Sequence, residues 1–455
     1  MIDKLAIFGA TGDLTARYLL PALASLRVSG QLSENFQLIA VGREDWSNDD
    51  FLKWADEQLG RHAGELDYSA RAAVVSASRY LKADAADPAS VAPIIADGQR
   101  VAAYLALPPF VFPGAVSALH SAGLPDGSRI VLEKPFGEDL ASAISLNRLL
   151  AGVVPEQAVF RVDHFLAMTT VQNLLGTRLA NRVFEPIWNS AHIAEIDIVW
   201  DEDLTLEGRA GYYDAVGALK DMLQNHLLQL LCLVAMEPPV SLSERDLRDR
   251  KVDVLRSLRP LSDSDVERHT RRGRYTAGRI GDREVPAYVG EEGVDPAHRT
   301  ETFAEIELTL DNWRWPGTVF RLRTGKAMRR ARREVAVHFR HVPHMPFGRD
   351  EDALPNQLRF GLDPESVTFD LTGIGARSGT LSPISLTAQT PKSELPAYGQ
   401  LLHAVLTGET ALSIRGDEAE ESWRVVTPVL DAWAKDLVPL QEYAAGTDGP
   451  ARFTA

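Results

Sequence analysis

Residues 4–14 read KLAIFGATGDL, and this stretch decides the fold of the N-terminal part of the chain. Its first five residues predict a short buried strand, and a glycine turn follows at once. Residues 15–26 then carry leucines at steps of three and four, which is the period of a helix. A strand, a glycine turn and a helix in this order predict a pyrophosphate-binding unit, because glycine lets the backbone come close and the helix N-terminus attracts negative charge. The spacing differs from GxGxxG, so a plain tight turn is the alternative. The expected coenzyme contacts at the turn are Gly9, Thr11, Gly12, Asp13 and Leu14.

Strand-like and helix-like patterns alternate up to about residue 163, which predicts a parallel sheet covered on both faces. Beyond it, strand-like runs follow one another and predict a large, mainly antiparallel sheet with helices. We therefore expect a Rossmann-type doubly wound coenzyme domain at 1–163 (α/β) and an α+β substrate domain at 164–455. The expected strands are 4–8, 37–41, 101–107, 129–132, 195–199, 302–310, 318–323, 334–339, 357–362 and 366–371. The expected helices are 15–26, 49–59, 70–77, 113–122, 213–236, 397–406 and 417–434, and the charge-rich segment 241–274 is expected to face solvent.

Composition excludes several functional classes. The 455-residue chain has a net charge of -15, which argues against nucleic acid and against anionic membranes as partners. No apolar run reaches the roughly 18 residues that would suggest a membrane span. The single cysteine, Cys232 in LLQLLCLVAM, predicts a buried inert thiol, and the absence of a disulfide within the chain suits the reducing cytoplasm.

The residues after the second and fourth expected strands bear on the coenzyme. NAD would favour an acidic residue after the strand at 37–41, whereas Arg43 stands there and suits the 2′-phosphate of NADP. Glu44 and Asp45 follow directly, so NAD use stays open, and a surface ion pair is the alternative role for Arg43. Pro108 ends the strand at 101–107 and is a further expected coenzyme contact.

Two polar clusters are the candidates for catalysis. Residues 160–175 read FRVDHFLAMTTVQNLL and place Asp163 at the end of a short apolar run. Residues 221–226 read DMLQNH inside an otherwise apolar helical segment, where burial of so many polar groups is costly unless they are bonded or face a cleft. Histidine is the natural base near neutral pH, so His226 is the expected base, and a carboxylate such as Asp163 could orient it. A satisfied core histidine is the alternative.

Lys134 ends the strand at 129–132 and precedes Pro135. Ligands of doubly wound sheets bind beyond the carboxyl ends of the strands, so we expect Lys134 to contact ligand and the Lys-Pro bond to be cis. A surface lysine at a turn is the alternative.

Two other groups are not expected to form sites. The first is a histidine series without a clear carboxylate partner, for which surface positions are favoured over a metal site. The second is a basic run, expected to be a solvated edge or a local anion contact. The histidine series consists of His338, His341 and His344. The basic run consists of Arg329, Arg330, Arg332 and Arg333. No metal is expected.

Six segments resemble the glucose-6-phosphate dehydrogenase family, in the same order and over nearly the whole chain. They are GATGDL from Gly9, VGREDW from Val41, EKPFG from Glu133, RVDHFL from Arg161, GYYDAVGALKDMLQNHLLQLLCLVAM from Gly211 and DNWRWPGTVFRLRTGKAM from Asp311. The resemblance implies a Rossmann-type domain, a β+α domain that forms homodimers or homotetramers, and oxidation of a sugar C1 to a δ-lactone with NADP. It also implies roles: His226 as the base paired with Asp163, Lys134, Glu202, Asp221 and Lys326 as ligands of the sugar hydroxyls, and His164 facing the substrate phosphate.

The chain departs from the family at the phosphate end. Where the family reads DHYLGKE, the chain reads DHFLAMT, so Phe165 replaces a tyrosine and Met168 a lysine. Tyr18 replaces a family lysine in the first helix. Losing two hydrogen bonds to a phosphate would cost on the order of 10²–10⁴-fold in affinity.

These departures predict a sugar C1 dehydrogenase with an altered, non-phosphate or differently substituted C6 end. One alternative is an ordinary glucose-6-phosphate dehydrogenase in which His164 holds the phosphate with help from Arg17 or Lys220. Another, of a different class, is a non-catalytic sugar- or nucleotide-binding paralogue.

Overall fold

The computed structural model describes the whole chain except residues 207, 348–355, 376–380, 390–392 and 452–455. It divides into two compact units. Unit 1 comprises Met1–Met168, Pro239–Arg248 and Lys392–Glu420, and unit 2 comprises Thr169–Pro238, Asp249–Pro391 and Glu421–Ala455. The expected single boundary between 163 and 164 therefore lies close to the first division, but the chain contributes to unit 1 twice more downstream.

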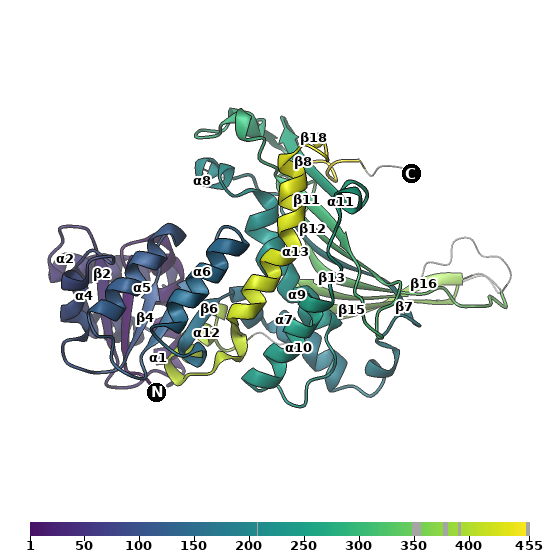
Figure 1. The fold of residues 1–455 in the computed structure, drawn as a ribbon. Helices are drawn as coiled ribbons and strands as arrows, with labels where there is room; N and C mark the ends of the chain where they lie inside the picture. The colour runs from purple at the N-terminus through teal and green to yellow at the C-terminus, as the bar shows by residue number, and fades with distance from the viewer. Residues whose placement is uncertain (207, 348–355, 376–380, 390–392, 452–455) are drawn as a thin grey trace. The chain divides into compact units, whose positions relative to one another are not determined.

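Unit 1 is built on a seven-stranded sheet with the order β17-β6-β5-β4-β1-β2-β3 (Figure 1). All pairs are parallel except that of β17 with β6. The strands are β1 Lys4–Phe8, β2 Gln37–Gly42, β3 Ser78–Lys82, β4 Val101–Leu105, β5 Arg129–Glu133, β6 Val159–Val162 and β17 Ser413–Ile414. The helices include η1 Thr15–Leu19, α1 Leu20–Val28, α2 Asn48–His62, α3 Tyr68–Ser76, α4 Pro88–Ile95, α5 Phe112–Ser121, α6 Leu140–Ala151 and α12 Ala397–Thr407. The expected Rossmann-type architecture is confirmed.

Residues from the C-terminal part of the chain complete unit 1. Leu401 and Leu402 of α12 belong to the same buried cluster as Leu23 of α1. Strand β17 pairs with the edge of β6, where the backbone N–H of Arg161 donates to the hydroxyl of Ser413 at 2.9 Å. Segment 393–420 thus covers α1 and closes one edge of the seven-stranded sheet.

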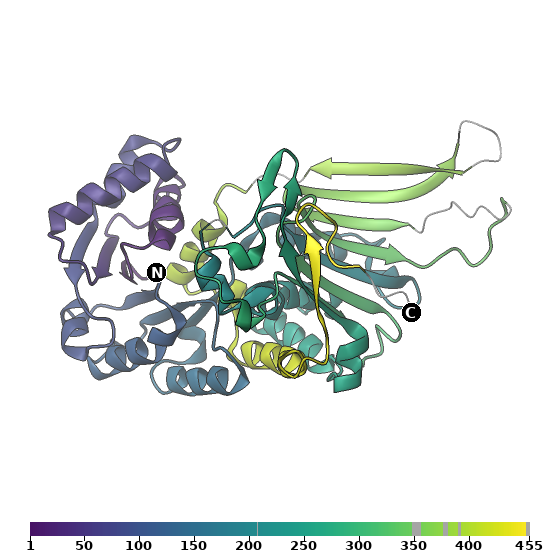
Figure 2. The ribbon, with the colours of Figure 1, turned by 90° about the horizontal axis from the view of Figure 1, so that it is seen from above.

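Unit 2 is built on a nine-stranded sheet with the order β16-β15-β14-β13-β7-β12-β11-β8-β18. The pairs β7–β12 and β8–β18 are parallel and the others are antiparallel, so the expected mainly antiparallel sheet is confirmed. Figure 2 shows the pale green strands β14–β16 side by side at one end of this sheet. The strands are β7 Ile193–Asp201, β8 Thr270–Thr276, β11 Phe303–Leu308, β12 Val319–Gly325, β13 Arg332–Phe339, β14 Gln357–Leu362, β15 Glu365–Ile374, β16 Leu381–Gln389 and β18 Leu440–Ala444.

The helix expected at 213–236 is interrupted. It is observed as α8 Ala210–Asp214, then the π-helical segment η6 Leu219–Leu227, then α9 Leu228–Ala235. Gly217 lies between the first two with a φ of 74°, a left-handed conformation that favours glycine, and an added Cβ there would meet Glu301 Oε1 at 2.5 Å. The expectation of one continuous helix was wrong because this turn lies inside an apolar pattern.

The segment 241–274 is not simply solvent-facing, which corrects a second expectation. It forms α10 Glu244–Ser257, α11 Asp263–His269 and the start of β8. Arg271 and Arg272 are buried, because Glu305 binds the first guanidinium at 2.5 Å and Asp436 binds the second at 2.8 Å. Two arginines of this charge-rich segment are therefore buried in ion pairs, and the Arg271–Glu305 pair lies within the sheet.

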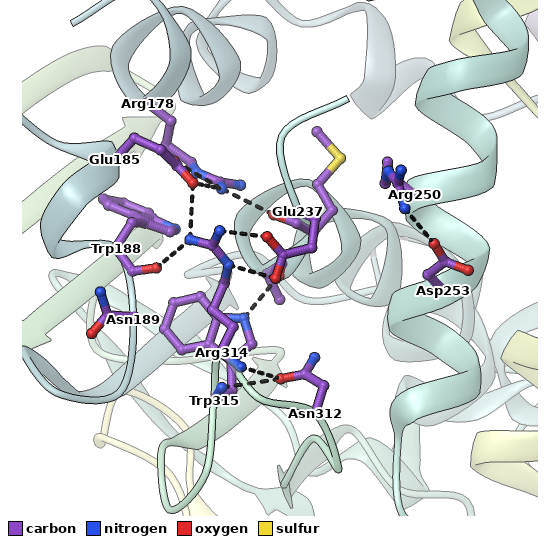
Figure 3. A network of polar contacts seen from close by, with 12 residues as sticks. Arg178, Glu185, Trp188, Asn189, Glu237, Arg250, Asp253, Asn312, Arg314 and Trp315 are labelled. Carbon is purple, nitrogen blue, oxygen red and sulfur yellow. Dashed lines mark hydrogen bonds and ion pairs between the residues drawn. The ribbon is translucent and has the colours of Figure 1, made fainter. Parts of the chain in front are cut away.

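A polar network anchors the C-terminal end of α9 (Figure 3). The fully buried Arg178, in helix α7 (Thr169–Leu179), donates to the carbonyl oxygens of residues 233, 234 and 236 at 2.9–3.0 Å. The indole N–H groups of Trp188 and Trp315 donate to the carbonyls of residues 234 and 235, each at 2.8 Å. The last carbonyls of a helix have no partner within the helix, so these donors satisfy them and fix the helix end.

No helix among the described residues combines the length and the apolar character needed to cross a bilayer.

Candidate functional site

The glycine turn after β1 has the form expected of a pyrophosphate cradle. Gly9 has a φ of 83°, and a Cβ there would lie 2.2 Å from the carbonyl oxygen of Ala106. Its own N–H and that of Ala10 are used by the carbonyl oxygen of Val41 at 2.9 and 3.0 Å. The N–H of Gly12 donates to the carbonyl oxygen of Gly9 at 3.1 Å, whereas among the described residues three other N–H groups before the helix bind no acceptor. They belong to Thr11, Asp13 and Leu14. These donors at a helix N-terminus fit a phosphate group.

The surroundings of Arg43 favour NADP over NAD. Arg43 is exposed after β2 and forms no ion pair within the described ranges. Of its two acidic neighbours, Asp45 pairs with Lys82 at 2.9 Å, and the carboxylate of Glu44 accepts the hydroxyl of Tyr80 at 3.5 Å. The acids that could have bound a ribose diol thus have other partners, while the cation is available for a 2′-phosphate.

The expected ligand contacts of unit 1 share one edge of its sheet. Gly9, Pro108, Lys134 and Asp163 follow the carboxyl ends of the parallel strands β1, β4, β5 and β6. The Lys134-Pro135 bond is cis, as expected. Asp163 is 1% exposed, and its Oδ1 accepts the N–H of Phe165 at 3.0 Å, which caps the short helix η4 His164–Ala167. The fold therefore gathers the unit 1 members of the expected site.

Glu133, at the end of β5, precedes the expected ligand contact Lys134 and was not among the residues expected from the sequence. Its Oε1 accepts the hydroxyl of Tyr104 at 2.5 Å, and Tyr398 of α12 also bonds to it. Burial raises the pKa of Glu133 to about 7, and the negative charge of Asp163 contributes a smaller increase. Glu133 lies inside the EKPFG motif, but no pattern could have connected it to Tyr398, which lies far downstream.

Aromatic rings surround His164. Its imidazole stacks on Tyr398 at 5.7 Å between ring centroids, with 17° between the planes, and meets Phe165 edge-on at 5.0 Å. Tyr18 also contacts Tyr398, with 5.2 Å between ring centroids. Phe165 is 3% exposed, so the replaced tyrosine position is part of the core. Arg17, one of the cations that could have substituted for the missing lysine, pairs with Asp13 at 3.0 Å instead.

In unit 2, His226 lies in the π-helical segment η6 and is 1% exposed. Its backbone N–H donates to Oδ1 of Asn225 at 2.6 Å, and the amide nitrogen of Asn225 donates to the carbonyl oxygen of Lys220 at 3.1 Å. The side chain of Asn225 thus stabilises the widened turn through two hydrogen bonds. Turns of π-helix occur frequently at functional sites. Asp163 belongs to unit 1 and His226 to unit 2, so their pairing stays a prediction.

Glu202 and Lys326 form an ion pair in unit 2. Strands β7 and β12 are parallel, and their ends pair in register at Asp201 and Gly325, so the two following residues face one another. The N–H of Glu202 donates to the carbonyl oxygen of Gly325 at 2.8 Å, which fixes this end of the sheet. Two of the expected sugar ligands are therefore brought together by strand register.

The N-terminal end of η6, which carries Asp221, is fixed by Glu301. The Oε1 atom of Glu301 accepts the N–H of Leu219 at 3.0 Å. Burial raises the pKa of Glu301. Tyr213 lies near both acids: burial first, and then the charges of Asp221 and Glu301, raise its pKa well above the ordinary value. Glu301 carried no signal in the sequence pattern, and Tyr213 lies in the segment that begins at Gly211 but was not singled out there.

The two groups not expected to form sites also have partners. His338 lies 3.2 Å from Asp197, which corrects the expectation that the histidine series has no carboxylate partner. Arg321 binds Asp197 at 2.8 Å and Glu195 at 2.5 Å, so a guanidinium supplies the positive charge there. Three arginines of the basic run are paired with acids, as Arg329–Asp448, Arg332–Glu334 and Arg333–Asp363. These are the local anion contacts expected.

Comparison with known proteins gives whole-chain matches. Residues 6–173 match the family model "Glucose-6-phosphate dehydrogenase, NAD binding domain", and residues 175–455 match "Glucose-6-phosphate dehydrogenase, C-terminal domain". The chain is 37% identical to glucose-6-phosphate 1-dehydrogenase of Zymomonas mobilis, covering 100% of this chain and 97% of the relative. It is 40% identical to that of Mycolicibacterium smegmatis, covering 98% and 93%.

Solved structures agree with these matches. One is glucose-6-phosphate 1-dehydrogenase from Mycobacterium avium, with a TM-score of 0.86 at 34% identity. Another is glucose-6-phosphate dehydrogenase in complex with glucose 6-phosphate, with a TM-score of 0.89 at 30% identity. Each alignment covers 99% of this chain and 96% of the other. The similarity therefore includes both units.

Proposed function

Because the chain belongs to the glucose-6-phosphate dehydrogenase family, we propose that it oxidises C1 of glucose 6-phosphate to the δ-lactone with NADP. The observation that carries the proposal is the buried His226, held by Asn225 in a π-helical turn, in a chain whose other unit presents a phosphate-binding glycine turn. Curated relatives that share 37–40% identity over nearly the whole chain bear this activity in their names, which supports glucose 6-phosphate as the substrate.

The proposed chemistry removes the proton of the C1 hydroxyl and a hydride from C1. The imidazole of His226 accepts the proton of the C1 hydroxyl, and the carboxylate of Asp163 stabilises the imidazolium that forms. NADP, when bound, supplies the acceptor for the hydride. Base catalysis of this kind contributes about 10²–10⁴-fold, and the remaining acceleration comes from positioning.

The sugar is proposed to be held by groups of both signs. Carboxylates accept hydrogen bonds and ammonium groups donate them, and each sugar hydroxyl can do both. Asp221 and Glu202 are the proposed acceptors, and Lys326 and Lys134 are the proposed donors. The Glu202–Lys326 ion pair supports this assignment, because it presents one acceptor and one donor at adjacent strand ends.

Replacing the base tests the catalytic proposal. His226→Asn keeps a polar side chain of similar size but removes the proton acceptor. We expect kcat for NADP reduction to fall at least 10²-fold while the dissociation constant for NADP changes little. The measurement is steady-state absorbance of the reduced coenzyme, with coenzyme binding followed by fluorescence. Unchanged kcat in this variant contradicts the assignment of His226. If the wild type reduces NADP and the variant does not, the non-catalytic paralogue is excluded.

A second candidate function is favoured by the ring cluster around His164. Phe165 and Tyr398 contact this imidazole, and the position of the family lysine is occupied by the uncharged Met168. A dianion in such surroundings loses hydration without full compensation by hydrogen bonds. This favours the same C1 chemistry on a hexose whose C6 carries no phosphate or another substituent.

Kinetics with a set of C6-modified hexoses distinguish the two candidates. If glucose 6-phosphate exceeds glucose in kcat/KM by several orders of magnitude, the altered-C6 candidate is excluded. The double variant Phe165→Tyr, Met168→Lys restores the hydroxyl and the ammonium that the family carries. On the altered-C6 candidate, this variant gains about 10²–10⁴-fold in preference for glucose 6-phosphate. On the first candidate, it gains about tenfold or less.

A further inference from the structure

The hydroxyl of Tyr213 differs from those of the neighbouring buried tyrosines in unit 2. The side chain is 4% exposed, and its hydroxyl has no hydrogen-bond partner among the described residues. The hydroxyls of Tyr275, Tyr288 and Tyr443, by contrast, bond to Glu291 at 3.1 Å, to Asp214 at 2.7 Å and to the carbonyl of residue 326 at 2.8 Å. Buried phenol hydroxyls usually have a hydrogen-bond partner, so a bound ligand is the expected partner of the Tyr213 hydroxyl.

The surroundings of this hydroxyl are those of the proposed sugar site. The ammonium of Lys326 lies 6.0 Å from the centroid of the Tyr213 ring. Burial, and then the charges of Asp221, Glu301 and Glu202, raise the pKa of Tyr213 well above the ordinary value. The phenol therefore keeps its proton throughout the pH range of an enzyme assay and serves as a hydrogen-bond donor.

A count of donors and acceptors shows what the site needs. Asp221 and Glu202 can only accept, and Glu301 is already used by the N–H of Leu219. Lys326 can only donate, and one of its N–H groups is engaged by Glu202. Hydroxyls that donate to the carboxylates have oxygen lone pairs left over, and these need donors. The phenol of Tyr213 is a donor of this kind within unit 2.

We propose that Tyr213 donates a hydrogen bond to a ring hydroxyl of the hexose, and so contributes to recognition of the sugar's hydroxyl pattern. This inference rests on the proposed function. It assigns to Tyr213 a contact that completes those of Asp221, Glu202 and Lys326, and it makes the hydroxyl, rather than the ring, the selective part of the side chain.

The test combines Tyr213→Phe with sugars that each lack one hydroxyl. Steady-state kinetics are measured with glucose 6-phosphate and with its 2-deoxy, 3-deoxy and 4-deoxy analogues. We expect kcat/KM of the variant for the full sugar to fall by about tenfold or more. For the one analogue that lacks the partner hydroxyl, the fall is expected to be less than about twofold, because the contact is already missing.

Stability of the ligand-free protein gives a readout that a structural role would not produce. Removal of an unpartnered buried hydroxyl leaves Tm unchanged or raises it. The matched control is Tyr275→Phe, which removes a hydroxyl bonded to Glu291. In the control, Tm is expected to fall, and any effect on kcat/KM is expected to be the same for every sugar.

Three outcomes overturn the inference. The first is a Tyr213→Phe variant that loses nothing with the full sugar. The second is a loss that is equal for all four sugars. The third is a wild-type protein that reduces NADP with none of these sugars; it also overturns glucose 6-phosphate as the proposed substrate, whereas the first two leave that function intact.

Discussion

The carboxyl group of Glu133 lies in surroundings that make it gain or lose its proton within the pH range of ordinary enzyme assays. It accepts the hydroxyl of Tyr104 and lies at the strand end that precedes Lys134. Its pKa, raised by burial to about 7, compares with an ordinary value near 4.5. Between these two values the folded protein holds a proton that the unfolded chain has released. The stabilisation by this proton is complete below pH 4.5 and is lost as the pH rises through about 7.

The variant Glu133→Gln should remove this dependence, because the amide stays neutral and keeps a similar shape. We expect wild type to lose about 1–3 kcal/mol of unfolding free energy from this group between pH 5 and pH 8, and the variant to lose correspondingly less. Chemical denaturation at the two pH values measures the difference. Glu138→Gln, at an exposed position in the same unit, is the control and should behave as wild type.

Individual site residues could be predicted where the local pattern carried them. Arg43, Lys134 and Asp163 follow strands that are visible in the sequence, and the structure places them at the carboxyl ends of those strands. Tyr398 and Tyr213 could not be found in this way. Tyr398 lies far downstream of Glu133, and Tyr213, although it shares a segment with Asp221, is brought to Glu301 and Glu202 only by tertiary folding.

At the scale of elements, the segment that carries His226 is held at both ends by side chains from elsewhere in unit 2. Glu301 binds the N–H of Leu219 at its start, and Arg178 binds three carbonyls at the end of α9. These contacts fix the two ends of the continuous helical segment made of η6 and α9. The sequence predicted a single helix because its apolar pattern continues through Gly217, and only the contact with Glu301 shows why the chain must break there.

Removal of the clamp at α9 should therefore destabilise unit 2. Arg178→Ala leaves buried carbonyls unpaired and deprives Glu185 of one of its two cations. We expect the free energy of unfolding to fall by about 3–5 kcal/mol. Arg250→Ala is the control, since the Arg250–Asp253 pair drawn in Figure 3 is exposed and should contribute less than about 1 kcal/mol. A loss in the first variant no larger than in the second would contradict the role given to Arg178.

At the scale of the whole molecule, both architectures could be predicted, but not the way in which the chain divides between them. Alternating strands and helices indicated the parallel sheet, and consecutive strands indicated the antiparallel one. No pattern in the sequence indicated that residues 393–420 belong to unit 1. Strand β17 has only two residues, too few for any periodicity, and the apolar face of α12 does not reveal which domain it covers.

A fragment ending at Met168 should consequently fold poorly. It lacks α12, which covers α1, and β17, which pairs with β6. We expect residues 1–168 alone to show exposed apolar surface and a broad thermal transition. The same fragment joined through a flexible linker to residues 392–420 should unfold cooperatively. Dye binding and circular dichroism measure both properties. Equal cooperativity in the two fragments would show that the returning segment is dispensable.

The late position of β17 also bears on how the protein is made. The ribosome releases the five parallel strands β1–β5 and then β6 long before residue 414 leaves its exit tunnel. Throughout that interval the nascent coenzyme sheet has an unpaired edge at β6, which could pair with another chain. The period of greatest exposure to misassembly therefore falls during translation and lasts until nearly the whole chain has been synthesised.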